Sequence, residues 1–235
     1  RHSFPTRRSS DLWNAGVTGA RWTNGIGFVA GSKSLIDILR VSSRTYVFSG
    51  TMQPQAVEGS LAAIREAAPR PQLICVDQEG GRVARLRPPH WRAYPPALEL
   101  AKRPDAARAI YVNARMIAQE LRVAGITMDC APVADVLAPE CHQIIGDRAF
   151  GDSAAKVIPL ARAQSEALLD GGILSILKHI PGHGRATMDS HETLPVVSAP
   201  LRELEACDFA TFKALADLPL AMTAHILYPA LDGKE

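Results

Sequence analysis

The chain has 235 residues, of which 47% are hydrophobic and 21% are charged, so its composition predicts a packed globular core and excludes a disordered chain. The formal net charge of +2 is too small to indicate nucleic-acid binding, and every apolar run is shorter than a membrane span. We therefore expect a cytoplasmic domain of enzyme size that binds neither nucleic acid nor a membrane.

The four cysteines lack the Cys-x-x-Cys spacing of a zinc ribbon, and they stand at Cys75, Cys130, Cys141 and Cys207. Three of them lie in or beside segments with a buried pattern. We therefore expect buried free thiols in a reducing compartment, and neither disulfides nor a zinc ribbon.

The two ends of the chain differ from its middle. Residues 1–12 are polar, basic and without periodicity, so we expect a foreign or disordered tail there. The final residues follow an apolar, strand-like run without a helix to close it. We therefore expect the chain to be a fragment of a longer protein.

From residue 71 onward, strand and helix patterns alternate. Short apolar runs predict strands at 72–78, 126–136, 173–180 and 220–229, and the segments between them predict helices at 104–125, about 153–170 and 201–217. Within the first helix, apolar residues recur at helical spacing at Ile110, Ala114, Ile117 and Leu121. Such alternation predicts parallel strands joined by helical crossovers, in a doubly wound sheet or a (β/α)8 barrel.

Two features favour the barrel. No glycine-rich phosphate loop joins a strand to a helix, although a nucleotide-binding sheet would need one. Polar side chains also stand where the strands end, at Asp77, Asp135, Lys178, His179 and His225. In a barrel these ends converge on the face that carries the active site. The prediction is an α/β fold, a partial (β/α)8 barrel of the TIM type over residues 69–235, truncated at its C-terminus.

Two loops carry candidate binding residues. The stretch "DQEGGRVARLR" (77–87) places Asp77 and Glu79 at the end of a strand, and two glycines then lead to Arg82, Arg85 and Arg87. The acids would accept hydrogen bonds from substrate hydroxyls and an arginine would bind a carboxylate, although a salt bridge within the loop is the slightly better interpretation of this stretch alone. The stretch "IIGDRAFG" (144–151) adds Arg148, which is weak evidence alone. For His225, a site residue and a polar core residue are equally good interpretations.

The stretch "KHIPGHGRATMDSH" (178–191) is richer in ionisable side chains. Asp189 and His191 flank one residue, so a carboxylate can orient the imidazole for acid/base catalysis. Alternatively, these two residues with His179 and His183 would bind a metal ion. A purely structural loop ranks third, because four ionisable groups follow one strand.

These motifs, together with "APVADV" (131–136) and "MTAHILYPALD" (222–232), resemble glycoside hydrolase family 3, in particular its bacterial β-N-acetylhexosaminidases of cell-wall recycling. The resemblance covers about residues 71–232. It implies a (β/α)8 barrel that removes terminal N-acetylglucosamine from muropeptide-derived sugars with retention of configuration. It implies no cofactor or metal, and a monomer in the intact family.

The resemblance also implies roles for individual residues. His191 would be the catalytic acid/base and Asp189 would orient it, while sugar would be bound by Asp77, Arg85, Arg148, Lys178 and His179. The family's nucleophile is an aspartate in a strand after the motif at 222–232, and Asp232 does not match it. We therefore expect the 235-residue chain to be impaired as a catalyst, and the alternative is a barrel that binds amino sugars without cleaving them.

The segment before residue 69 follows another pattern. Residues 25–67 resemble part of the pyridoxal-phosphate α-oxoamine synthases, from just after their cofactor lysine. Lys33 follows the glycines of this stretch, so we assign it no Schiff-base chemistry. We expect residues 13–68 to be a separate segment of uncertain packing, joined to the barrel near residues 66–72 in a chimera.

Overall fold

The computed structural model describes residues 17–23, 26–31, 61, 73–139, 143–188 and 194–232. The chain divides into two compact units, residues 1–71 and 72–235. In the first unit, β1 (Val17–Thr23) and β2 (Ile26–Gly31) form an antiparallel pair. The expected tail at 1–12 lies outside the described residues.

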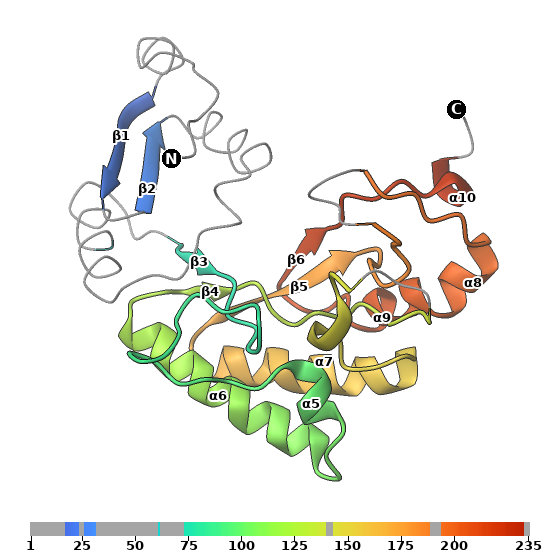
Figure 1. The fold of residues 1–235 in the computed structure, drawn as a ribbon, viewed down its shortest axis with the longest axis horizontal. Helices are drawn as coiled ribbons and strands as arrows, with labels where there is room; N and C mark the ends of the chain where they lie inside the picture. The colour runs from blue at the N-terminus through green and yellow to red at the C-terminus, as the bar shows by residue number, and fades with distance from the viewer. Residues whose placement is uncertain are drawn as a thin grey trace. The chain divides into compact units, whose positions relative to one another are not determined.

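The second unit is built on a parallel sheet of four strands: β3 (Cys75–Val76), β4 (Met128–Asp129), β5 (Leu174–Ile180) and β6 (Leu220–Thr223). Their spatial order is β3-β4-β5-β6, which is also their order in the chain (Figure 1). A doubly wound sheet reverses its strand order at one point, whereas each barrel strand is added on the same side of the previous one. The observed order is that of a barrel, and the described residues form part of one.

Helices lie in the connections between these strands, and one more helix follows the last strand. The chain contains α5 (Ala97–Ala101), α6 (Ala106–Val123), the 3-10 turn η1 (Gly146–Arg148), α7 (Ala154–Asp170), α8 (Leu201–Ala206), α9 (Asp208–Ala214) and α10 (Pro229–Asp232). Helix α7 contacts α6, α9 and β5 (Figure 1). Consecutive helices thus pack side by side along the sheet, as in the outer layer of a barrel.

The two long helices confirm the sequence prediction closely. In α6 the predicted stripe is buried: Ile110, Ala114, Ile117 and Leu121 are each at most 1% exposed. Helix α7 ends at Gly171 and Gly172, where Gly172 has a φ of 77° that few other residues adopt readily.

Four predicted elements are shorter than predicted or broken. The segment 72–78 is a strand only at β3. The segment 126–136 is a strand only at β4, because Pro132 has no N–H for a ladder. Its carbonyls still pair with β5, since Ile176 and Lys178 donate N–H groups to Ala131 and Pro132 at 3.0 Å each. The predicted helix 201–217 is interrupted at Cys207, whose φ and ψ of −123° and −75° are not helical, and the last strand ends at Thr223 instead of residue 229.

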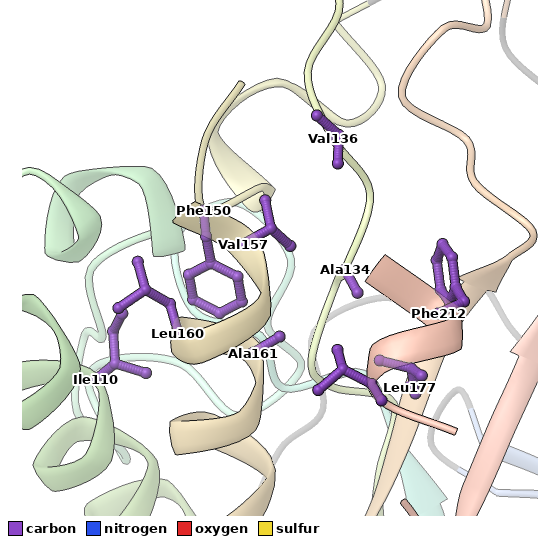
Figure 2. Packing of buried hydrophobic residues seen from close by; sticks show 10 residues of the cluster. Ile110, Ala134, Val136, Phe150, Val157, Leu160, Ala161, Leu177 and Phe212 are labelled. Atoms are coloured by element: carbon purple, nitrogen blue, oxygen red, sulfur yellow. The ribbon is translucent and has the colours of Figure 1, made fainter. Parts of the chain in front are cut away.

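The main core lies between the helices and the sheet. Figure 2 shows Phe150, which precedes α7, packed among Ile110 of α6 and Leu160 of α7, with Leu177 of β5 and Phe212 of α9 in the same cluster. Phe150 is 2% exposed. This cluster fixes α6, α7 and α9 against β5, and therefore fixes the end of β5, where the charged residues begin.

Candidate active site

A buried lysine lies at the centre of the charged cluster at the carboxyl ends of the strands. Lys178, near the end of β5, is 1% exposed. Its Nζ contacts Asp77 Oδ1 at 2.9 Å and Glu79 Oε1 at 2.5 Å, both on the segment that follows β3. An ammonium removed from water is stable only when paired and hydrogen-bonded, so these two carboxylates hold Lys178 in its charged form. Their charges outweigh burial and raise the pKa of Lys178.

Glu79 connects this lysine to Arg148. The Arg148 guanidinium binds Glu79 through two bonds of 2.8 Å, from Nε to Oε2 and from Nη2 to Oε1, and its Nη1 donates to the Ile144 carbonyl at 2.9 Å. Burial alone would raise the pKa of Glu79, but the charges of Lys178 and Arg148 lower it to about 2. Glu79 is therefore ionised throughout the neutral range and joins two cations from different elements.

A second carboxylate organises the start of the histidine loop. Asp135 is fully buried, and its Oδ2 lies 2.7 Å from His179 Nδ1. Its Oδ1 accepts backbone N–H bonds from His179 at 3.3 Å and His183 at 2.6 Å. Burial would raise the pKa of Asp135, but His179 and the His183 N–H lower it overall, whereas burial lowers the pKa of His179. The pair is best described as an ionised Asp135 carboxylate that accepts a hydrogen bond from the Nδ1–H group of a neutral His179 imidazole. The Nε2 atom of His179 is then a hydrogen-bond acceptor.

A buried glutamine, Gln78, sets the position of Arg85. Gln78 is 1% exposed, and its Oε1 accepts the backbone N–H groups of Arg85 at 2.9 Å and Leu86 at 3.0 Å. This folds the loop so that Arg85 Nη2 lies 3.6 Å from Asp77 Oδ2. Both side chains remain partly exposed, Arg85 at 14% and Asp77 at 13%.

Exposure divides the cluster into two layers. Lys178 and Glu79 are 2% and 6% exposed at their side chains and form an inner layer of paired charges. Asp77, Arg85 and His179, at 13 to 16%, reach solvent at its outer edge. The outer residues can contact a polyhydroxylated ligand, and the inner ones hold them in place.

The five sugar-binding candidates of the sequence are thus brought together: Asp77, Arg85, Arg148, Lys178 and His179 all belong to this cluster or to its direct ion pairs. The sequence pointed to Glu79 only as an acid at the end of a strand, and it gave no role to Gln78. The available signal for Gln78 was its position between Asp77 and Glu79, immediately after a buried strand.

The stem of the histidine loop is fixed from three directions. Arg185 Nε donates to Asp208 Oδ2 at 2.6 Å, where Asp208 is a buried residue of α9. The Tyr228 hydroxyl donates to the Gly182 carbonyl. Gly184 lies so close to the Val136 carbonyl that a Cβ there would come within 1.7 Å of its oxygen. The loop therefore leaves the cluster along a defined path up to Met188.

The catalytic pair expected from the sequence, Asp189 and His191, lies outside the described residues, so its role stays a prediction. The same holds for the metal-site hypothesis, which needs both residues. The rings of its other two members, His179 and His183, lie 5.7 Å apart between centroids. Among the described residues, no group of three or more His, Cys, Asp or Glu side chains is arranged to hold a metal ion.

His225 follows β6 and is exposed. The interpretation of His225 as a polar core residue is therefore wrong. Within the described part of the chain, no helix is both long and apolar enough to cross a membrane.

A sequentially ordered parallel sheet with a buried charge cluster at its carboxyl ends defines a (β/α)8-barrel protein whose polar mouth is its site. The family model described as the Glycosyl hydrolase family 3 N terminal domain matches residues 39–235. The chain belongs to glycosyl hydrolase family 3. The match begins inside the segment 25–67, whose resemblance to the α-oxoamine synthases stays a prediction.

Individual relatives agree with this assignment. A Beta-hexosaminidase of Xanthomonas oryzae pv. oryzae is 42% identical over 182 residues, which cover 74% of this chain and 53% of that protein. Beta-hexosaminidase LpqI of Mycobacterium tuberculosis is 39% identical over 181 residues, covering 76% and 46%. The crystal structure of NagZ from Neisseria gonorrhoeae in complex with N-trifluoroacetyl-D-glucosamine matches with a TM-score of 0.72 at 33% identity, covering 78% of this chain and 56% of that one. The chain spans about half the length of the curated relatives it matches.

Proposed function

We propose that this chain is the sugar-binding and acid/base part of a retaining β-N-acetylglucosaminidase that releases terminal N-acetylglucosamine from peptidoglycan-derived muropeptides. The observation that carries the proposal is the cluster around Lys178, in which a buried ammonium holds Asp77 at the open end of a barrel. The names of the relatives, and the amino-sugar analogue bound to the NagZ structure, support an amino-sugar substrate.

Sugar recognition follows from the outer layer of the cluster. The Asp77 carboxylate is an acceptor for ring hydroxyl groups, and the Arg85 guanidinium is a donor to hydroxyl or carbonyl oxygens. The second ring nitrogen of His179 adds an acceptor beside them, because Nδ1 is held by Asp135. Since the inner ion pairs fix these groups before the ligand arrives, little ordering entropy is lost on binding.

The acid/base role is proposed for His191, oriented by Asp189. Glycosidic cleavage needs a proton at the departing oxygen and a base for the incoming water. An imidazole changes protonation near neutral pH, so one group can serve both steps. Support for this role comes from the stem of the loop, which is fixed next to the cluster at Gly182, Gly184 and Arg185.

Binding by the 235-residue chain tests this function without requiring both catalytic groups. We expect N-acetylglucosamine to bind in calorimetric titration, and glucose, which lacks the acetamido group, to bind more weakly. Arg85→Ala should weaken binding of N-acetylglucosamine by about tenfold or more, the usual effect of one charge-assisted hydrogen bond.

The matched control is Lys156→Ala, which removes an exposed cation of α7 that pairs with Asp152, two residues before the helix. It should leave the affinity unchanged. Equal binding by wild type and Arg85→Ala would contradict the proposed site. If a chelator abolished binding and an added divalent metal restored it, the metal-dependent hydrolase hypothesis would replace the proposal.

A further inference from the structure

Two cysteine thiols lie in contact beneath the charged cluster. Cys75 is in β3, and Cys130 directly follows β4. Their Sγ atoms are 3.1 Å apart, within hydrogen-bonding distance for sulfur. The backbones are held together at the same point, because the Cys130 N–H donates to the Val76 carbonyl at 2.8 Å. The contact therefore depends on strand pairing and not on a flexible loop.

The two thiols differ in access to solvent. Cys75 is exposed, which corrects the expectation of a buried thiol, whereas Cys130 is 7% exposed and confirms it. The hydrogen bond between the two thiols and burial both raise the pKa of Cys130, so this thiol keeps its proton. An oxidant from solvent therefore meets the Cys75 sulfur first, with Cys130 placed behind it as a resolving thiol.

We propose that Cys75 and Cys130 form a redox modification site, at which hydrogen peroxide converts the thiol pair into a reversible disulfide. The Cys75 sulfur attacks one peroxide oxygen and the O–O bond breaks, so that Cys75 becomes a sulfenic acid, while the departing hydroxide takes up the proton of the Cys75 thiol and leaves as water. The Cys130 sulfur then attacks the Cys75 sulfur, its proton leaves with the hydroxyl as a second water, and the S–S bond forms. Two thiols are oxidised and one peroxide is reduced to two waters.

The position of this pair links it to the charged cluster. A disulfide has an S–S distance of about 2.05 Å, so its formation draws the two sulfur atoms roughly 1 Å closer. Cys75 stands two residues before Asp77, and Cys130 follows Asp129, whose Oδ1 accepts the Gln78 N–H at 2.9 Å. The crosslink would thus join the two strand ends that position Asp77 and Gln78.

The experiment treats the folded 235-residue chain with hydrogen peroxide and follows its intact mass. In the double variant Cys141→Ser/Cys207→Ser, which keeps only the proposed pair, we expect the mass of two hydrogen atoms to be lost and to return with dithiothreitol. Peptide mapping should join Cys75 to Cys130. The reaction should slow by about tenfold or more in guanidinium, where the folded contact is lost.

The matched control is the double variant Cys75→Ser/Cys130→Ser, which keeps Cys141 and Cys207. Under the same conditions it should not lose two hydrogen atoms. Because serine at a buried position can destabilise the chain, differential alkylation of the untreated and oxidised wild type provides a second measurement: Cys75 and Cys130 should be protected together. Overoxidation of Cys75 alone, or a disulfide through Cys141 or Cys207, would overturn the proposal. These readouts follow thiol chemistry alone, so their outcome is separate from that of the sugar-binding proposal.

Discussion

Asp129 is a fully buried carboxyl group close to three other charges. Its Oδ1 accepts the Gln78 N–H, and within the described residues its Oδ2 has no hydrogen-bond partner. Burial raises its pKa to about 7, and the nearby carboxylates Asp77 and Glu79 also raise it, whereas the Gln78 N–H and Lys178 lower it. The protonated acid is therefore the form that the fold favours at mildly acidic pH.

This shift predicts how stability depends on pH. Because the pKa of Asp129 is raised from 3.8 to about 7, its contribution is fully present below pH 3.8 and is lost as the pH rises through 7. One such group can change the free energy of unfolding by at most about 1.4 kcal/mol per pH unit. Asp129→Asn, which cannot ionise, should become more stable relative to wild type by about 2 kcal/mol between pH 5 and pH 7.

Urea unfolding at pH 5 and at pH 7 measures this difference. Glu79 affects the free energy of unfolding in the opposite direction, because its pKa is lowered to about 2 and the stability that it contributes is lost only in strong acid. It therefore does not disturb the comparison between pH 5 and 7. The same pH dependence in wild type and Asp129→Asn would show that Asp129 is ionised in the folded chain.

At this scale the sequence predicted which residues converge, but not how they pair. Asp77, Lys178 and His179 were predicted from their places at strand ends, and the structure brings them together. The bidentate pair of Glu79 with Arg148 was not predictable, because it joins residues 69 positions apart through a loop with no periodic signal. Partners of a buried charge depend on the tertiary fold.

Among the elements, one of the three contacts that fix the stem of the histidine loop is a close approach of two backbones. Gly184 packs against Val136, so Gly184→Ala must displace one of the two segments. We expect a loss of about 1–3 kcal/mol in the free energy of unfolding, as for overpacked sites, together with weaker sugar binding. Urea unfolding and calorimetric titration measure the two effects.

Gly151→Ala is the matched control. Gly151 is also buried, but the three atoms nearest to a Cβ built there all belong to the flexible Lys156 side chain, the first at 3.2 Å. Because that side chain can move aside, this variant should lose less than about 1 kcal/mol, the level at which overpacking effects begin. If Gly184→Ala behaved in the same way, the loop stem would not be fixed by this contact.

The elements also show where a sequence pattern is sufficient. The helices α6 and α7 were predicted closely because a buried stripe at helical spacing continues over several turns. The strand segments at 72–78 and 126–136 were predicted too long, because an apolar run shows burial but not ladder pairing. The break at Cys207 carries no glycine or proline signal and was not predictable.

At the scale of the whole molecule, the strand order carries the functional argument. Because β3, β4, β5 and β6 follow one another in space, their carboxyl ends open on the same side, and residues from positions 77 to 179 meet there. The sequence predicted this barrel from strand-helix alternation and from polar strand ends. Sequential order itself is a property of strand pairing, and the structure supplies it.

A crystal structure of the chain with bound N-acetylglucosamine would test the central claim most directly. We predict ring hydroxyl groups within about 3.2 Å of the Asp77 carboxylate and of His179, with the inner contacts of Lys178 to Glu79 unchanged. A sugar bound at the opposite ends of the strands, or bound without contact to Asp77 and His179, would contradict it.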